Sequence, residues 1–370
     1  MSYEVTEEQE QLRLMLRELF AGRARPRDSF DSGPPLDREI WARLSELGLV
    51  GIFVPEEHGG SGGGLFDQTL VAEEIGAFAV AVPVVTSSLA AFLLTRLATE
   101  EALAAVPAVT GGADAVLAAV SAARGFDLGL TAVEENGGWR VSGSVDDLLE
   151  AASASSLVLP ADTAGGPAWF LVNVAGAGVD LLDQPSLDQT QRLGALTLNS
   201  APAGPLGADP GESLVAQASR LAWLLLAAQA TGAAERALRL TVEYAGKRRA
   251  FGQPIGRFQA VKHRVAEMLL SVENARSAAY NAAWAQDSGR TDVELASHMA
   301  KAVATENAVS VIQTAIQMHG GIGYTWEHDL HLLLRRAKSC ELVLGNPTVH
   351  FSAIANALLD PHLVKAGSAS

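Results

Sequence analysis

The sequence predicts an α+β fold in three parts: a helical N-terminal domain (residues 1–105), a middle β domain (106–208) and a C-terminal helical bundle (209–370). Three observations predict this organisation. Apolar residues recur at helical spacing at both ends of the chain. Short segments of alternating pattern, separated by glycine-rich turns, fill the middle. Long helical stretches with short connections close the sequence, which is typical of an antiparallel four-helix bundle.

Helical stretches are expected in the N-terminal part over residues 6–22, 37–47 and 67–104. Thr6 and Gln9 have the spacing of a capping box, in which each side chain bonds the backbone of the other. Asp37 is the expected N-cap of the second helix, which ends before Gly48. Pro83 is expected to divide the third stretch into two helices.

The middle part predicts a small β domain of six to eight strands, a barrel or a sandwich. The expected strands include Gly129–Val133, Trp139–Ser142, Ser156–Leu159, Ala168–Val174 and Gly194–Leu198. Asn136-Gly137-Gly138 stands between two of these segments and is a typical hairpin signal. Residues 113–123 are expected to form a helix that leads into the domain, with a loop or strand as the alternative.

The C-terminal part begins with an expected helix over residues 212–245, which is apolar nearly all round and should be buried inside the bundle. The following helices are expected over residues 259–287, 294–318, 327–343 and 348–358. We expect this bundle to form the interface between subunits.

Composition excludes several classes of protein. The 370 residues include 48% hydrophobic ones, enough for a large core, and the net charge of −15 argues against nucleic acid as a general partner. No uninterrupted apolar run reaches membrane-spanning length, and the acidic N-terminus does not resemble a signal peptide. The only cysteine, Cys340, rules out an intrachain disulfide and fits a reducing cytoplasm. The sequence shows no Cys/His cluster with metal-ligand spacing, so no metal is expected.

A local reversal of charge occurs at residues 247–259, KRRAFGQPIGRFQ. Its cations are Lys247, Arg248, Arg249 and Arg257. Four cations at a connection between helices favour an anion such as a phosphate or pyrophosphate, although a solvated basic turn is the alternative. A second stretch, residues 317–323 (QMHGGIG), offers glycines that allow close approach to a ligand. Gln317 can hydrogen-bond a base or a ribose edge.

These two stretches, together with L-L-R-R-A-K further on, resemble the C-terminal half of the acyl-CoA dehydrogenase family in order and spacing. The N-terminal stretch G-L-x-G-I-F-V-P-E-E-H-G-G-x-G and Glu73-Glu74-Ile75-Gly76 also resemble that family. The resemblance implies FAD as cofactor, an acyl-CoA substrate and an electron-transfer flavoprotein as acceptor. It also implies that six residues hold the adenosine and pyrophosphate of an FAD whose flavin ring lies mostly on the neighbouring subunit: Arg248, Phe251, Gln259, Gln317, Gly320 and Gly321.

The middle part departs from the family pattern on the side of the flavin ring. Where the family has a T-E-P-x-x-G-S-D loop that binds flavin and thioester, this chain has Ser121–Gly129, SAARGFDLG. Where the family has K-x-W-I-T-N-A, this chain has Ser144–Ala151, SVDDLLEA, with carboxylates in place of the Trp and Thr.

The catalytic base of the family is also missing. In the family, a glutamate takes the α-proton of the acyl-CoA while flavin N5 takes a hydride from the β-carbon. Aligning Lys338 and Gly345 with the family's lysine and glycine puts Leu344 at the usual glutamate position, so no catalytic residue is expected in this chain. In a smaller branch the glutamate lies on the first bundle helix, where this chain has Ala222 with Trp223 beside it.

Other residues offer only weak substitutes for the base. Glu341 and Glu243 are the nearest carboxylates, and both are expected to form ion pairs instead. His319 is expected to pack or bond locally, and Cys340 to be a small buried residue. Asn346 and Thr348 follow Gly345, where the family often has residues near the flavin.

The adenosine side of the site is therefore kept, while the flavin-ring side and the base are lost. This combination is similar to the non-catalytic subunits of actinobacterial α2β2 acyl-CoA dehydrogenases, which act on steroid side-chain CoA thioesters. Such a chain would give its FAD contacts to a homologous partner that carries the glutamate. The alternatives are a self-sufficient homotetramer with an unusual base, a flavin-free scaffold, and a flavin oxygenase on the same fold.

Overall fold

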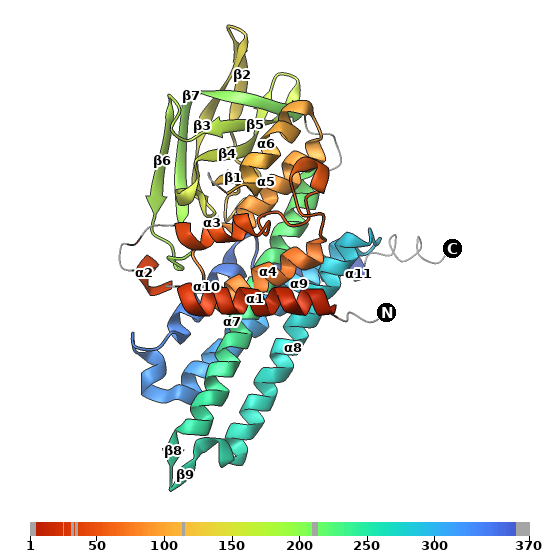
Figure 1. Cartoon of the computed structure of the whole chain (residues 1–370). Helices are drawn as coiled ribbons and strands as arrows, with labels where there is room; N and C mark the ends of the chain where they lie inside the picture. Colours follow the sequence, from red (N-terminus) through yellow and green to blue (C-terminus); the bar gives the residue numbers. More distant parts are fainter. Residues whose placement is uncertain are drawn as a thin grey trace, which may run out of the picture. The chain divides into compact units, whose positions relative to one another are not determined.

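The computed structural model describes residues 5–24, 26–30, 33, 36–112, 115–208 and 214–359 (Figure 1). The chain divides into two compact units. The first unit comprises Met1–Leu16, Ala72–Ala79 and Trp223–Ser370, and the second comprises Arg17–Val71 and Val80–Ala222. Each unit is described by itself below.

The helices before the sheet are α1 (Glu7–Arg23), α2 (Pro26–Phe30), α3 (Arg38–Glu46), α4 (Leu65–Ala77), α5 (Val84–Leu97) and α6 (Glu100–Thr110). The expected caps are confirmed. The backbone N–H of Thr6 donates to Gln9 Oε1 at 3.0 Å, and the N–H of Gln9 donates to Thr6 Oγ1 at 3.3 Å. The Asp37 carboxylate accepts from the N–H of Ile40 at 3.0 Å. Pro83 immediately precedes α5, so the expected break is also confirmed.

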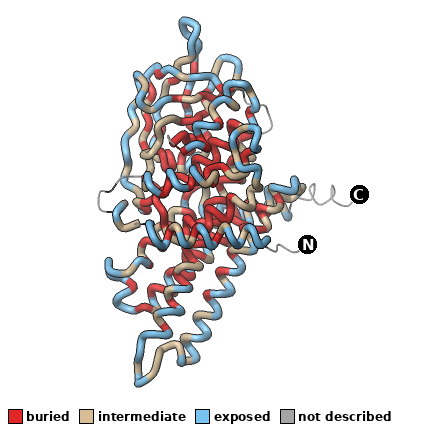
Figure 2. The backbone as a smooth tube through the Cα atoms, in the orientation of Figure 1, coloured by how far each residue is buried: buried red, intermediate tan, exposed pale blue. Residues whose placement is uncertain are grey.

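Strands β1 to β7 lie in the second unit: β1 (Val116–Ala118), β2 (Thr131–Glu135), β3 (Gly138–Leu148), β4 (Ser156–Thr163), β5 (Gly166–Asn173), β6 (Val179–Gln184) and β7 (Leu193–Ala208). They follow the order β1-β4-β2-β3-β7-β5, and β5 pairs again with β4, which closes the sheet into a barrel. Strand β6 pairs with β7 outside this ring. Buried apolar residues such as Phe170 form the core of the barrel, and Trp139 packs against Phe170. Figure 2 shows the turn between β2 and β3 as exposed.

In this region the predicted hairpin is confirmed and one predicted helix is wrong. Asn136 and Gly137 form the turn between β2 and β3, both with positive φ, as a two-residue turn of this kind requires. The helix expected over residues 113–123 is instead strand β1, which pairs in parallel with β4. An apolar run this short cannot be assigned to helix or strand from periodicity, and here burial on both faces decides for the strand. Residues 113 and 114 lie outside the described residues.

The helices after the sheet are α7 (Leu214–Lys247), α8 (Gln259–Asp287), α9 (Val293–His319), α10 (Leu330–Leu342) and α11 (Pro347–Leu359). They confirm the expected bundle, with boundaries within a few residues; residues 212 and 213 lie outside the described part. A small hairpin, β8 (Arg249–Ala250) with β9 (Gln253–Pro254), joins the ends of α7 and α8 (Figure 1). No single described helix is long and apolar enough to cross a membrane; α10 and α11 pass that test only together, as a bent pair.

Two glycines bring helices α4 and α7 into backbone contact within the first unit. A Cβ atom added to Gly232 would lie 1.8 Å from the carbonyl oxygen of Glu73. One added to Gly76 would lie 2.1 Å from the carbonyl oxygen of Gln229. Since each glycine faces the backbone of the other helix, the helices cross at a distance that no larger residue allows.

This close crossing places Glu73 and Glu74 inside a buried network of charged groups. Glu73 accepts hydrogen bonds from Arg13 at 3.4 Å, from Arg276 at 3.2 Å and from the Tyr280 hydroxyl at 2.8 Å. Glu74 accepts from Arg13 at 3.2 Å, and Glu235 pairs with both arginines. Burial, together with the Glu73 carboxylate, raises the pKa of Tyr280 well above its ordinary value, so its hydroxyl remains a donor.

We expect Gly232→Ala to lower the free energy of unfolding by about 3 kcal/mol, because the added methyl group must push two backbones apart. Urea denaturation measures this change. Gly246→Ala is the matched control in the same helix, since a Cβ there meets nothing within 4 Å. It should change stability by less than about 1 kcal/mol. Equal effects of the two substitutions would contradict the close crossing.

Candidate functional site

The β8–β9 hairpin turns through Phe251 and Gly252, whose φ angles are 50° and 80°. Glycine adopts such a conformation freely, whereas a phenylalanine is strained there. The Phe251 side chain is 96% exposed, so this strained turn presents an aromatic ring to the outside of the bundle. The hairpin is fixed at its base, where the N–H of Ile255 donates to the carbonyl of Arg248 at 2.8 Å.

Exposed cations are concentrated around this hairpin. The side chains of Arg248, Arg249 and Arg257 are exposed and form no hydrogen bond or ion pair with the described residues. Lys247 faces Glu243 at 4.0 Å, a distance at which an exposed pair contributes little. The cluster is therefore available to an anion from outside the chain.

The end of α9 lies beside the end of α7. The Tyr244 hydroxyl donates to the carbonyl oxygen of His319 at 3.3 Å, and the two rings stack with centroids 4.4 Å apart. This contact joins α9 to the part of α7 that immediately precedes the first basic stretch, residues 247–259. His319 is buried, and its Nδ1 donates to the carbonyl of Ala315 at 2.8 Å, which confirms its expected packing role.

The glycines after His319 leave open space at this end of the bundle. A Cβ added to Gly320 or Gly321 would meet no described atom within 4 Å, and Gln317 is exposed one turn before them. A pocket of about 460 Å³ lies between α7 and α8, next to the hairpin. Its lining combines apolar groups such as Val242 and Pro254 with the cations Arg257 and Lys262. This combination can hold a flat apolar group that carries an anion.

The connection between α10 and α11 holds Leu344 with φ of 58°, in the left-handed region. Its carbonyl oxygen accepts from Trp223 Nε1 at 3.1 Å and from His350 Nε2 at 3.2 Å. The structure therefore brings together Leu344 and Trp223, which the sequence placed at or next to the two alternative positions of the base. Neither side chain can accept a proton.

A buried lysine bonds backbone carbonyls of the same connection. The sequence analysis did not predict this contact. Lys301 is fully buried, and its Nζ donates to the carbonyl oxygens of Glu341 at 3.1 Å and Gly345 at 2.8 Å. Burial lowers the pKa of Lys301 to about 8. His298 Nδ1 lies 2.8 Å from His350 Nδ1. Since His350 Nε2 donates to a carbonyl, its Nδ1 is the acceptor in this pair.

The substitute carboxylates have the roles that were expected of them. Glu341 pairs with Lys338 one turn earlier in α10, at 2.5 Å. The Glu243 side chain is exposed on α7. Cys340 is fully buried, as predicted. Among the described residues, no group of three or more His, Cys, Asp or Glu side chains could hold a metal ion.

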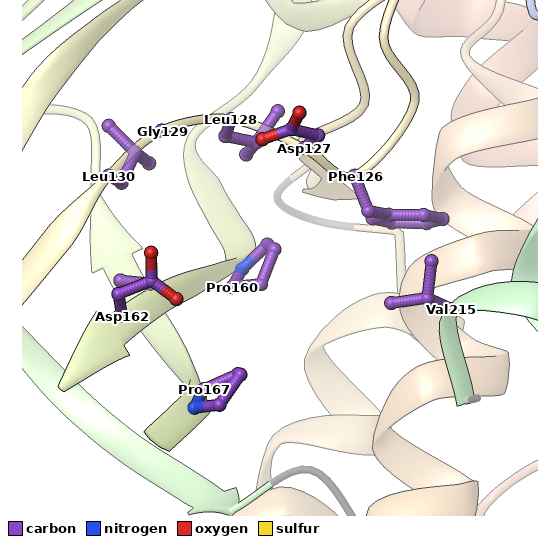
Figure 3. A pocket seen from close by; sticks show the side chains of 10 residues that line it. Phe126, Asp127, Leu128, Gly129, Leu130, Pro160, Asp162, Pro167 and Val215 are labelled. Carbon is purple, nitrogen blue, oxygen red and sulfur yellow. The ribbon is translucent and has the colours of Figure 1, made fainter. Parts of the chain in front are cut away.

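In the second unit, a pocket of about 310 Å³ lies beside the Ser121–Gly129 loop (Figure 3). Phe126, Leu128 and Leu130 form much of its apolar wall. Asp127 and Asp162 also line it, and none of the lining residues is a cation. A pocket that carries two carboxylates repels phosphate groups, so its charge does not favour the phosphates of a CoA ester.

Comparison with known proteins identifies the family of this chain. The model of the acyl-CoA dehydrogenase N-terminal domain matches residues 6–110, and that of the C-terminal domain matches residues 216–359. The chain is 32% identical to the acyl-CoA dehydrogenase IpdE2 of Mycobacterium tuberculosis, over 92% of this chain and 94% of that protein. The chain therefore belongs to the acyl-CoA dehydrogenase family, flavoprotein oxidoreductases that act on acyl-CoA.

Two solved structures share the fold over nearly the whole length. The ChsE4-ChsE5 complex from Mycobacterium tuberculosis superposes with a TM-score of 0.86 at 28% identity, over 97% of this chain and 99% of that one. A variant of the Tcur3481-Tcur3483 steroid ACAD gives a TM-score of 0.84 at 28% identity, over 99% of this chain and 100% of that one.

FAD is the cofactor of this family, and the exposed cations and open glycines at this end of the bundle are compatible with a diphosphate. The unpaired cations suit the diphosphate, and the open glycines allow its close approach. The residues that would hold it are Arg248, Phe251, Gln259, Gln317, Gly320 and Gly321, hereafter the clamp. The bound flavin would supply the hydride acceptor.

The His350 site predicts a pH dependence of stability. Burial, with smaller effects of Lys301 and His298, lowers the pKa of His350 to about 4 from an ordinary value of 6.5. Between these two pH values the unfolded chain binds a proton that the folded chain does not. Stability is therefore lost as the pH falls from 6.5 to 4, by up to about 3 kcal/mol.

Urea denaturation at pH 4.5 and pH 7 measures this loss. His350→Gln, which keeps a donor for the Leu344 carbonyl, should reduce the difference between the two pH values. His263→Gln is the control, because His263 is exposed on α8. A pH dependence that remains the same in both variants would contradict the assignment to His350.

Proposed function

We propose that this chain is a non-catalytic subunit of a heteromeric acyl-CoA dehydrogenase. It would supply the clamp for the adenosine and diphosphate of FAD. A homologous partner would supply the flavin-ring contacts and the glutamate that removes the α-proton. The observation that carries the proposal is a contrast within this one chain. Exposed cations and open glycines lie at the hairpin end of the bundle, while the α10–α11 connection presents Leu344 instead of a carboxylate.

The clamp supports the binding half of the proposal. Its polar side chains are exposed and form no hydrogen bond or ion pair with the part of the chain that the structure describes, so a ligand would not have to break one. The strained Phe251 turn supports it as well, because strain of this kind is retained where it serves a function. The ring stays exposed although the Phe258 ring lies edge-to-face beside it, with centroids 6.1 Å apart. An adenine or a partner's side chain would therefore gain apolar contact by covering it.

The connection around Leu344 supports the non-catalytic half. Proton abstraction at an α-carbon requires a base whose proton affinity has been raised by burial. The nearest carboxylate, Glu341, is instead paired with Lys338. The backbone at Leu344 is held by Trp223, His350 and, one residue on, Lys301. A fixed backbone does not let a distant carboxylate swing into this position.

The relatives support a homologous partner and a substrate class. The ChsE4-ChsE5 complex contains two different chains, and the Tcur3481-Tcur3483 protein is described as a steroid acyl-CoA dehydrogenase. By analogy we assign this chain a heterotetramer that acts on a steroid side-chain CoA thioester, in the cytoplasm, with an electron-transfer flavoprotein as acceptor. This assignment rests on similarity and not on a sterol pocket in this chain.

The flavin content of the protein tests the proposal. The chain is expressed alone and together with a homologous dehydrogenase subunit, and flavin is measured by visible absorbance. We expect the pair to carry one FAD per two chains and to be bleached by an acyl-CoA, whereas the lone chain does neither. If the lone chain carries one FAD per subunit and turns over an acyl-CoA, it is a complete enzyme and the proposal is wrong.

Arg248→Ala should weaken FAD binding by the complex about tenfold to a hundredfold. The substitution removes a charge-assisted contact to the diphosphate, worth roughly 1.5–3 kcal/mol. FAD retained after dialysis and the dissociation constant measured by flavin fluorescence give the readout. Arg264→Ala is the control, since Arg264 lies on the same bundle but pairs with Glu267. If FAD content is unchanged in Arg248→Ala, the clamp assignment is wrong.

A further inference from the structure

Two carboxylates near the end of strand β3 adopt a backbone conformation that is unusual for them. Asp147 has φ of 64° and Glu150 has φ of 56°, both in the left-handed region. A residue other than glycine is disfavoured there, so interactions of the side chain or backbone must compensate. The side chains of the two residues form different hydrogen bonds, which offset the cost of this backbone conformation in different ways.

The Asp147 carboxylate accepts hydrogen bonds from donors in the loop that precedes Phe126. Its Oδ1 accepts from the Ser121 hydroxyl at 2.9 Å, and its Oδ2 accepts from the N–H of Ala123 at 3.0 Å. The Ser121 hydroxyl itself accepts from the N–H of Arg124 at 3.0 Å, which orients its proton toward Asp147. The loop therefore directs a hydroxyl and an amide at one carboxylate.

The backbone carbonyl and N–H of Asp147 are also both hydrogen-bonded. Its carbonyl accepts from the N–H of Ala122 at 2.9 Å, and its N–H donates to Gln184 Oε1 at 3.3 Å. Ser121 and Gly125 bond each other in both directions, which closes the loop into a tight turn. Ser121 is fully buried, whereas Asp147 is only half-buried. The loop donor Ser121 therefore lies inside the protein, and the carboxylate that it bonds lies nearer the surface.

We propose that the loop Ser121–Gly125 is a binding site for a carboxylate or carbonyl oxygen, and that Asp147 occupies it as an internal ligand. The second unit then needs no bound cofactor or substrate at this loop to satisfy its donors. Glu150 differs: it is deeply buried and bonds Thr86 at the start of α5 and Gln191, so no outside ligand could replace it. The proposal does not depend on FAD binding by the clamp.

Chemical rescue tests this inference. Asp147→Gly removes the carboxylate but suits the positive φ, so the loss measured is that of the internal ligand. We expect the unfolding temperature of the full chain, in whichever assembly it is purified, to fall by about 5 °C. Sodium formate should restore it along a saturating curve in the millimolar range, while sodium chloride at equal ionic strength should not. Formate should leave the wild-type protein unchanged, because its site is filled.

Asn136→Gly is the matched control, since Asn136 has φ of 53° in an exposed turn of the same unit. Formate should have no effect on this variant. Recovery that does not saturate, or equal recovery in all three proteins, would overturn the proposal. So would an absence of recovery in Asp147→Gly.

If Asp147→Gly does not fold, a double-mutant cycle with Ser121→Ala and Asp147→Ala replaces it. The two substitutions remove partners of one hydrogen bond, so their effects on the unfolding midpoint should be clearly less than additive. Strictly additive effects would show that the two side chains act independently and would overturn the proposal. This result is independent of the flavin content that tests the subunit role.

Discussion

The buried network around Glu73 is the constraint on which the first unit depends. It ties α1, α4, α7 and α8 together, because Arg13, Glu235 and Arg276 converge on one pair of adjacent carboxylates. Ions buried in this way stabilise a fold only when their partners are in place; removal of one partner leaves an uncompensated charge. The network forms only where the glycine crossing lets α4 approach α7. Charge and close packing therefore specify the same arrangement of helices.

That arrangement sets where the functional groups lie. Helices α7 and α8 extend from the network to the end that carries the hairpin, and the Tyr244–His319 contact joins the end of α9 to α7. The residues that could bind a ligand lie on exposed loops, and the helices of the bundle hold these loops in place. The α10–α11 connection has the opposite character, since a buried lysine, a histidine and a tryptophan satisfy its carbonyl oxygens. The first unit thus has one end with exposed groups that a ligand could reach. It also has one connection whose polar groups are already bonded within the chain.

Much of this could be predicted from the sequence because it depends on local patterns. Capping residues, the Asn136-Gly137 turn and the bundle helices follow from spacing and turn chemistry, and Leu344 was identified by its place between a lysine and a glycine. The Lys301 contacts and the His298–His350 pair could not be predicted, since they join residues distant in the sequence. The Glu73-Glu74-Ile75-Gly76 stretch was recognised, but its partners Arg13 and Tyr280 carry no local signal. Strand β1 was mistaken for a helix because a short buried run has no distinguishing period.

The hydrogen bond between Trp223 and Leu344 also bears on how this chain could evolve. It links a residue beside one of the family's base positions to the residue at the other, so the two positions are no longer independent. A glutamate regained at residue 344 would arrive next to an indole and a backbone already engaged by His350. Substitutions at several sites would then have to coincide before any of them improved proton transfer. In the proposed role, the loss of catalysis is therefore hard to reverse. Selection can then maintain the chain only through its contribution to the function of a partner protein.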